Sequence, residues 1–419
     1  MKVGLLIIAT EILDGKINDL NTKFLAEFLR HHHLELQLTL TVKDIESDIH
    51  LGLKTLFEKC DLIVTSGGLG PTLDDLTKAT IASYLGRKIS FSETAENIAR
   101  ENYLRFERPV PPKEHGYHYM PEGFVALANS TGMAPGLFAE HLGHFIFSAP
   151  GVPREFKSMI QDHLLKLICS KLDQNIVIET ISARTKRVPE EKIFGEVDPD
   201  LWEKLAKYGD VSSLPVFFGV DIGVKIKAKN QQELDEKKTA VLNIFHNSAV
   251  MPHIWHFGLE SLEEVIVMMA NKKKVTFGFA ESCTGGLCSH RITNVSGSSK
   301  CFYGSVVSYD NSVKSHLLSV KEKTLQDFGA VSVETAAEMA SGLANELKVD
   351  IAISISGIAG PGGGSLEKPV GTVCIGSMVN GVLGAEKLKF FGDREQLKNR
   401  FSQAALMKLL EHLEKIASP

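Results

Sequence analysis

The sequence contains no long apolar run, and it carries no excess of positive charge. Its first apolar stretch, Met1 to Thr10, is already followed by Glu11, so it is too short for a signal peptide or a membrane span. We therefore expect a buried first strand and a cytoplasmic protein without a membrane partner. The formal net charge of −5 argues against nucleic acid as the main partner, because nucleic-acid-binding surfaces are basic.

Cysteine is scarce and follows no pattern. The six cysteines include no C-x-x-C pair and have no histidines at the spacing of a zinc site. This excludes a zinc finger and a disulfide framework, and we expect the thiols to be reduced. The cysteines are Cys60, Cys169, Cys283, Cys288, Cys301 and Cys374.

The composition is that of a globular multidomain protein. With 419 residues, 43% of them apolar and 23% charged, the chain is long enough for two or three domains. Up to residue 171, apolar strands alternate with helix-like stretches, among them 75–85 and 152–167, which predicts an α/β domain with a mainly parallel sheet in three layers. Residues 172–256 read as a smaller βαββα section. Residues 257–419 read as a further α/β domain, with a helix that begins at Leu259. The middle section resembles a KH fold but has no G-x-x-G between basic residues, so we expect no nucleic-acid binding there.

A candidate nucleophile follows the apolar run 275–279. The segment 280–286, Ala-Glu-Ser-Cys-Thr-Gly-Gly, predicts a strand that opens through a small-residue turn into a helix. Such a turn displays the Ser282 hydroxyl and leaves backbone N–H groups unpaired beside it, as in an oxyanion hole. The alternative is that Ser282 only caps the helix. Cys283 is the competing nucleophile, since a thiol is more reactive at neutral pH, but two adjacent side chains in a turn rarely face the same pocket.

A candidate base lies downstream. The segment 306–314 predicts a strand that runs into a helix and carries Tyr309 and Lys314 about one and a half turns apart. Lysine accepts a serine proton only if burial or a neighbouring dipole lowers its pKa. Lys314 is therefore a candidate base and Tyr309 a residue that relays or orients the proton, whereas an ordinary lysine on a helix would be solvated. The glycine loop 360–364 allows backbone to approach a ligand.

These motifs together resemble the C-terminal domain of the CinA family, the nicotinamide mononucleotide deamidases. The matching segments are AESCTGG, VSYDNSVK, GAVS at 329–332, SGIAGPGGGSLEKPVGTV and FGDR at 391–394. The resemblance implies hydrolysis of the carboxamide of nicotinamide mononucleotide to nicotinic acid mononucleotide and ammonia, without a cofactor. It makes Ser282 the nucleophile, Lys314 the general base and Tyr309 its helper. Candidate substrate-binding residues, including those for the phosphate, are Cys283, Thr284, Gly285, Gly286, Gly360, Gly362 and Arg394. For Arg394 the alternative is a surface ion pair with Asp393 or Glu395.

A second constellation follows strand 62–65. Gly67, Gly68 and Gly70 form a loop at the carboxyl end of this strand, where backbone N–H groups can reach phosphate. With Thr72, Asp75, Asp44 and Arg154, this region resembles the molybdopterin-binding fold of the CinA N-terminal domain. The resemblance implies a pyrophosphatase that acts on ADP-ribose with Mg, Mn or Co.

The residues are compatible with that chemistry. Asp44 and Asp75 are candidate metal ligands and Arg154 a phosphate contact, although Asp75 is also favourable at a helix N-terminus. The family usually has Gly-Thr-Glu where this chain has Ala9-Thr10-Glu11, and the Ala9 methyl group narrows the space beside the loop.

The sequence leaves three classes of function open. The deamidase is favoured by the complete set of Ser282, Lys314 and Tyr309. The alternatives are ADP-ribose pyrophosphatase as the main activity and a non-catalytic, competence-related protein that binds a partner. On family grounds alone we expect a homodimer.

Overall fold

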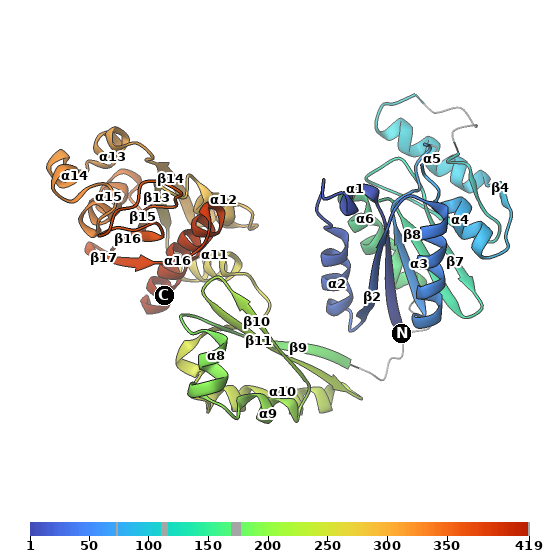
Figure 1. The fold of residues 1–419 in the computed structure, drawn as a ribbon, viewed down its shortest axis with the longest axis horizontal. Coiled ribbons are helices and arrows are strands. Elements are labelled where there is room, and N and C mark those ends of the chain that lie inside the picture. The colour runs from blue at the N-terminus through green and yellow to red at the C-terminus, as the bar shows by residue number, and fades with distance from the viewer. Residues whose placement is uncertain (73, 110–115, 169–176, 418–419) are drawn as a thin grey trace. The chain divides into compact units, whose positions relative to one another are not determined.

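The computed structural model describes residues 1–72, 74–109, 116–168 and 177–417. The chain divides into two compact units, one of residues 1–179 with 225–239 and one of residues 180–224 with 240–419. Figure 1 labels the helices and strands along the chain. The expected boundary at residue 171, like Cys169, lies outside the described residues, and the three-domain division stays a prediction. Within the described ranges, no helix is long and apolar enough to span a bilayer.

The first unit contains a six-stranded sheet in the order β2-β1-β3-β8-β7-β6. Parallel pairing joins β1 to β2, β1 to β3 and β3 to β8, while β7 and β6 are antiparallel additions at one edge. The prediction of a mainly parallel sheet is therefore confirmed. The strands are β1 Lys2–Ile8, β2 Glu35–Val42, β3 Leu62–Ser66, β6 Val125–Leu127, β7 Gly136–His141 and β8 His144–Ala149, and a separate pair is formed by β4 Ile89–Phe91 and β5 Tyr119–Pro121.

Helices cover both faces of this sheet. Alternate residues of a strand point to opposite faces, so Val3, Leu5 and Ile7 pack with α2 and α6, whereas Leu6 and Ile8 pack with α3. The result is the expected three-layer arrangement. The helices are α1 Thr10–Leu13, α2 Asn21–His31, α3 Glu46–Lys59, α4 Thr77–Tyr84, α5 Glu93–Arg105, α6 Pro153–Met159, a π-helical turn Ile160–Leu164 and α7 Leu165–Ile168.

Two helix boundaries in this unit differ from the sequence prediction. The helix expected from residue 75 begins at Thr77, because the Asp75 side chain accepts hydrogen bonds inside the preceding loop. The helix expected over 152–167 is interrupted by the π-helical turn at Ile160–Leu164.

The middle section forms a four-stranded sheet in the order β10-β11-β9-β12. The predicted order of strand, helix, two strands and helix is found, and a fourth strand follows. The elements are β9 Val177–Thr185, α8 Glu190–Lys192, a π-helical turn Ile193–Val197, α9 Leu201–Ala206, β10 Asp210–Val216, β11 Gly219–Ala228, α10 Gln231–His246, a 3₁₀ turn Met251–His253 and β12 Ile254–Phe257.

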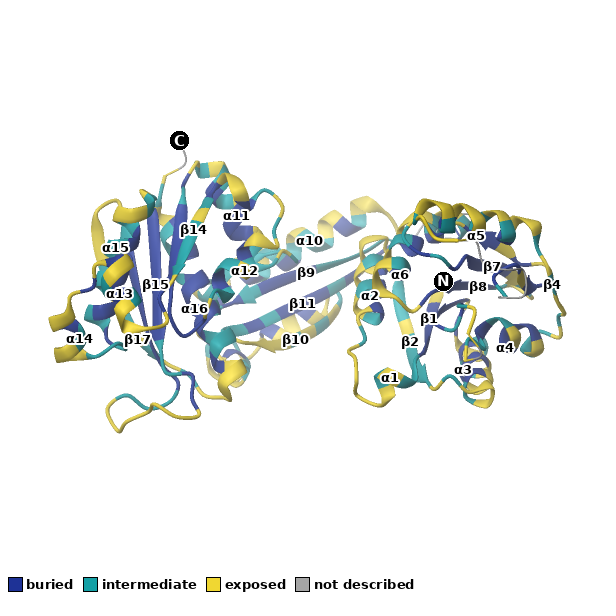
Figure 2. Ribbon diagram, turned by 90° about the horizontal axis from the view of Figure 1, so that it is seen from above, coloured by how far each residue is buried: buried dark blue, intermediate teal, exposed yellow. Residues whose placement is uncertain are grey.

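The C-terminal part is built on a five-stranded sheet in the order β14-β13-β15-β16-β17, with β14, β13 and β15 parallel. Phe277 and Phe279 pack on one face with α11 and α16, and Ala280 packs on the other with α15. The central strand β15 is buried along its length (Figure 2). The strands are β13 Phe277–Glu281, β14 Phe302–Val307, β15 Ile351–Gly357, β16 Thr372–Val379 and β17 Val382–Lys389.

The helices of this part are α11 Leu262–Lys273, α12 Leu287–Thr293, a 3₁₀ turn Ser298–Lys300, α13 Asn311–Leu318, α14 Glu322–Phe328, α15 Val333–Leu347 and α16 Arg394–Lys415. The helix expected to begin at Leu259 begins at Leu262. The reason is the N-cap Ser261, whose hydroxyl accepts from the Glu264 N–H while the Glu264 carboxylate accepts from the Ser261 N–H, as in a capping box.

Candidate functional site

Three motifs meet at the carboxyl edge of the C-terminal sheet. Because β14, β13 and β15 are parallel neighbours, the residues that follow them lie side by side at one edge. Backbone hydrogen bonds continue beyond the strand ends: the Ser282 N–H donates to the Ile355 carbonyl at 2.9 Å, and the Ser308 N–H donates to the Glu281 carbonyl at 2.8 Å. Segments that are far apart in the sequence are thereby joined around Ser282.

Ser282 and Lys314 are in direct contact. The Lys314 Nζ lies 3.2 Å from the Ser282 Oγ, 2.8 Å from the Ser308 carbonyl oxygen and 3.1 Å from the Tyr309 carbonyl oxygen. Lys314 is 1% exposed and Ser282 is 8% exposed. The solvated-lysine alternative is therefore wrong. Ser282 is not the cap of α12 either, since Gly286 occupies the N-cap position and no side chain caps it.

The surroundings of Lys314 favour the loss of its charge. Burial lowers the pKa of its ammonium, and Asp310 acts against this shift with a smaller effect. A neutral amine has two N–H groups and one lone pair. If the two carbonyl oxygens accept those N–H groups, the lone pair is directed at the Ser282 hydroxyl, which is the arrangement that a general base requires.

Cys283 is poorly placed to act as the nucleophile. Its thiol is buried in the apolar core that includes Phe279 and Ile355. Burial raises the pKa of the Cys283 thiol to about 12, against a smaller lowering effect of nearby backbone N–H groups. Because the thiolate is the reactive form, the geometry favours Ser282 over Cys283.

Glu281, the last residue of β13, supplies a buried carboxylate that the sequence argument did not use. Glu281 is fully buried, and its carboxylate accepts five hydrogen bonds of 2.7 to 3.1 Å. The donors are the hydroxyls of Thr284 and Ser289 and the backbone N–H groups of Gly286, Cys288 and Ser289. An acid directly before the serine of a strand-turn-helix motif was the available signal, because acids are favourable at helix N-termini.

This carboxylate corrects one expectation. The backbone N–H groups of Thr284-Gly285-Gly286 were candidates for holding an anion, but the Gly286 N–H donates to Glu281 and the Gly285 N–H donates to the Ser282 carbonyl. The Thr284 hydroxyl is buried and bonded to Glu281. The chain's own carboxylate thus occupies the start of α12, and a substrate phosphate cannot bind to the same N–H groups.

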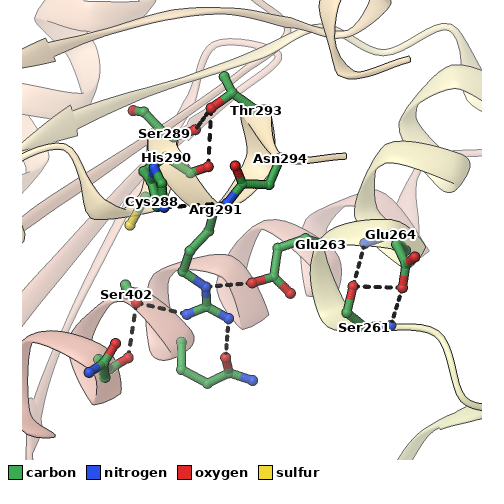
Figure 3. Close-up of polar contacts among 12 residues, drawn as sticks. Ser261, Glu263, Glu264, Cys288, Ser289, His290, Arg291, Thr293, Asn294 and Ser402 are labelled. Carbon is green, nitrogen blue, oxygen red and sulfur yellow. Dashed lines mark hydrogen bonds and ion pairs between the residues drawn. The ribbon is translucent and has the colours of Figure 1, made fainter. Parts of the chain in front are cut away.

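Helix α12 is held in place by Arg291 (Figure 3). The Arg291 guanidinium forms an ion pair with Glu263 of α11 and donates to the Ser402 hydroxyl of α16 at 2.7 Å and to the Gln403 side chain. These contacts use Nε, Nη1 and Nη2 of one planar group, which gives them a defined orientation. Together with Glu281 they anchor the helix that follows the Ser282 turn.

The other predicted residues of this site lie around Arg394, the first residue of α16. The Arg394 guanidinium donates to the Gly360 carbonyl at 2.6 Å and to the Tyr309 hydroxyl at 3.3 Å. Asp393 caps α16, and no ion pair joins Arg394 to Asp393 or Glu395 in the described residues. Gly362 is exposed in the loop that begins at Gly360.

Tyr309 lies differently from the expectation. Its side chain is 64% exposed and its hydroxyl accepts from Arg394, while its backbone carbonyl, not its hydroxyl, contacts Lys314. The hydroxyl is therefore not hydrogen-bonded to the Ser282–Lys314 pair. Tyr309 is thus linked to Lys314 through its backbone and to Arg394 through its side chain.

The second predicted site is a pocket of about 430 Å³ at the carboxyl edge of the first unit's sheet. Gly67, Gly68, Thr72, Asp44 and Asp75 all line it. Gly67 has φ +110°, and a Cβ there would lie 2.2 Å from the Ile8 carbonyl oxygen. Glycine is needed at this position because the loop passes directly against β1.

The two predicted metal ligands in this pocket already accept hydrogen bonds from the chain. The Asp44 carboxylate accepts from the Thr10 N–H and hydroxyl, both at 2.8 Å, and Asp75 accepts from the N–H groups of Gly70 and Thr72 at 2.8 and 2.9 Å. No group of three or more His, Cys, Asp or Glu side chains in the described residues could hold a metal ion. The oxygen donors nevertheless suit Mg²⁺, which is commonly bound by one or two carboxylates together with water and substrate phosphates.

Three further predictions for this pocket, on Ala9, Arg154 and Gly70, have different outcomes. Ala9 lines the pocket beside Gly67 and Gly68, as expected, and its φ of −164° is one that alanine adopts without strain. Arg154 was expected to contact phosphate, but it does not line the pocket, and its guanidinium donates to the Thr131 carbonyl at 2.8 Å. Gly70 is also absent from the lining.

Comparisons with known proteins find matches for both the N-terminal and the C-terminal part of the chain. Residues 4–169 match the model of a probable molybdopterin binding domain, and residues 259–413 match that of the CinA C-terminal domain. Among solved structures, a competence/damage inducible protein from Agrobacterium tumefaciens is 33% identical, with a TM-score of 0.35 over 38% of this chain and 99% of that one.

Two relatives match nearly the whole chain, including both regions that the family models match. A competence-damage inducible protein from Halothermothrix orenii is 36% identical over 414 residues, which are 97% of each chain. A CinA-like protein from Kosmotoga olearia is 34% identical over 415 residues, again 97% of each chain. The chain, an α/β protein with a molybdopterin-binding-like domain and a CinA C-terminal domain, belongs to the CinA family.

Proposed function

We propose that this protein is an amidohydrolase that converts nicotinamide mononucleotide to nicotinic acid mononucleotide and ammonia. The observation that carries the proposal is the buried contact of 3.2 Å between the Lys314 Nζ and the Ser282 Oγ. A buried amine with a lowered pKa beside a serine hydroxyl is a sufficient nucleophile-base unit for opening an amide.

The reaction proceeds in two halves. Neutral Lys314 takes the Ser282 proton as Oγ bonds to the carboxamide carbon. The resulting ammonium returns a proton to the amide nitrogen, the C–N bond breaks, and ammonia leaves an ester on Ser282. Lys314 then takes a proton from water, whose oxygen attacks the ester carbonyl. As the ester bond breaks, Lys314 returns its proton to the Ser282 oxygen, and the acid product loses its own proton to solvent and leaves as the carboxylate.

Selectivity for the nucleotide requires a group that binds its phosphate. Arg394 is the best candidate, because its guanidinium contacts Tyr309, whose carbonyl accepts from Lys314. It interacts with two neutral oxygens, those of Gly360 and Tyr309, and with no carboxylate in the described residues. A phosphate gains charge-assisted hydrogen bonds from such a group. The occupied N–H groups at Gly285 and Gly286 further favour Arg394 over the start of α12.

Ammonia release tests the proposal. Purified full-length protein is incubated with nicotinamide mononucleotide, with its riboside and with free nicotinamide, and ammonia is measured by a coupled assay. We expect turnover of the nucleotide, a marked preference for it over the other two, and no activity in Lys314→Arg, since guanidinium does not deprotonate. An active Lys314→Arg variant would exclude lysine as the base.

A second activity, hydrolysis of ADP-ribose, is supported by the pocket of the first unit. Its volume of about 430 Å³ is in the usual range for a small-molecule site, and Gly67 and Gly68 bring backbone close to a ligand. Asp44 and Asp75 would hold a divalent cation, which would neutralise phosphate charge. The test is AMP release from ADP-ribose with and without Mg²⁺, Mn²⁺ or Co²⁺, measured beside an Asp44→Asn variant.

A further inference from the structure

The second unit contains another pocket, of about 450 Å³, that neither proposed activity uses. Three segments line it: the segment 187–191 that follows β9, the segment 215–220 at the turn between β10 and β11, and the end of β17 at 388–390. Arg400 of α16 completes it. None of the residues around Ser282 is among its lining.

Three phenylalanines, Phe217, Phe218 and Phe390, contribute to the walls of this pocket. The rings of Phe218 and Phe390 have their centroids 6.2 Å apart at an interplanar angle of 43°, within the range in which aromatic pairs attract. Phe217 also lines the pocket and is 49% exposed. A pocket of a few hundred cubic ångströms with such walls fits a small aromatic ligand.

The charged side chains that line this pocket differ in whether they have a partner in the protein. Arg187 lies 3.4 Å from a carboxylate oxygen of Glu411, and its guanidinium also lies over the Phe218 ring at 5.6 Å. Of the two acids in the lining, Glu190 accepts a hydrogen bond from Ser213, and Glu191 is exposed to solvent. Lys389 lies over the ring of Phe391 at 5.4 Å.

Arg400 differs from these groups. Its Nε is buried and has no hydrogen-bond partner, and no ion pair involves its guanidinium within the described part of the chain. The Nε itself is closed to solvent, so the part of the guanidinium that a ligand can reach is its terminal Nη groups. A planar carboxylate in the pocket would give these groups the charge-assisted partner that they lack, and it matches the fork of the guanidinium. A dianionic phosphate would meet stronger repulsion from Glu190 and Glu191.

We propose that this pocket binds a small aromatic carboxylate of one or two rings, with the carboxylate on Arg400 and the ring against Phe218 and Phe390. The inference does not depend on either proposed activity, because binding itself is the readout. It assigns a second small-molecule site to the unit that contains Ser282.

The probe is 2-naphthoate, titrated into full-length protein by isothermal calorimetry and by ligand-observed NMR. We expect Arg400→Gln to weaken binding by about tenfold or more, as for the loss of a charge-assisted hydrogen bond. The matched control is Arg394→Gln, six residues earlier on the same helix but at the Ser282 site, which should bind 2-naphthoate as the unmodified protein does. The neutral 2-naphthamide should bind equally to Arg400→Gln and to unmodified protein.

Several results would overturn the assignment. Absence of 2-naphthoate binding at millimolar concentration would do so, as would equal binding by Arg400→Gln. Loss of binding in Arg394→Gln alone would place the ligand at the Ser282 site. Sedimentation of Phe217→Ala tests whether a second copy of the chain covers the pocket instead: a dimer that dissociates only in this variant would contradict a small-molecule site. Because Arg400 has no partner to lose, Arg400→Gln should melt at the temperature of the unmodified protein.

Discussion

Replacing Ser282 by alanine should abolish deamidation and leave the fold intact. In the described residues, the Ser282 Oγ has one hydrogen-bond partner, the Lys314 Nζ. Lys314 keeps the carbonyl oxygens of Ser308 and Tyr309 after the change, so it is not left without acceptors. The perturbation therefore removes the reacting atom and little else.

The two expected effects differ greatly in size. Loss of one hydrogen bond costs about 1 kcal/mol of stability, which corresponds to a fall of roughly 2–4 °C in Tm for a domain of 150–250 residues. Loss of a member of a nucleophile-base unit lowers kcat by roughly 10⁴- to 10⁶-fold. Ammonia release from nicotinamide mononucleotide gives kcat, and circular dichroism melting gives Tm.

Cys283→Ala is the matched control, because it truncates the adjacent side chain in the same turn. Its thiol is buried and its pKa is raised to about 12, so most of the activity should remain. If Cys283→Ala is inactive while Ser282→Ala is active and both melt normally, the serine assignment is refuted.

Further predictions follow from the same geometry. With Lys314 as the base, kcat/KM should rise with pH through a pKa below that of free lysine, because burial lowers it and only the neutral amine accepts a proton; a profile that falls over that range would contradict this role. Glu281→Gln should lower kcat and Tm together, since an amide cannot accept all five hydrogen bonds; unchanged values of both would show that the carboxylate is dispensable. Asp44→Asn and chelators should abolish ADP-ribose hydrolysis and spare deamidation, as separate assays of AMP and ammonia can show. Arg394→Ala should raise KM for the nucleotide by roughly 10-fold or more and leave the riboside unaffected, whereas equal losses on both would assign Arg394 to the fold.

Local sequence patterns were enough to predict most of the elements and to select Ser282 and Lys314, which the fold brings into contact. The alternation of apolar runs with amphipathic stretches predicted the parallel strands, since buried strands and helices have distinct periods. Ser282 could be chosen because it follows a strand in a turn of small residues, which displays its hydroxyl. Lys314 could be chosen because it lies near the start of the helix that follows a second strand, where a lysine can act as a base. The helix starts were less well predicted: Ser261 and Asp75 determine where α11 and α4 begin through side-chain contacts.

Burial and the pairing of hydrogen bonds were decided by the tertiary structure. The sequence alone could not show that Lys314 is 1% exposed, because its burial results from the packing of α13 beside the ends of two parallel strands. Nor could it show that the N–H groups at the start of α12 are occupied, since this depends on where the Glu281 carboxylate points. A long arginine side chain can reach many partners, and only the folded chain selects among them. Arg154 therefore contacts the Thr131 carbonyl and not its predicted pocket, whereas Arg394 contacts Gly360 and Tyr309 of the predicted C-terminal site.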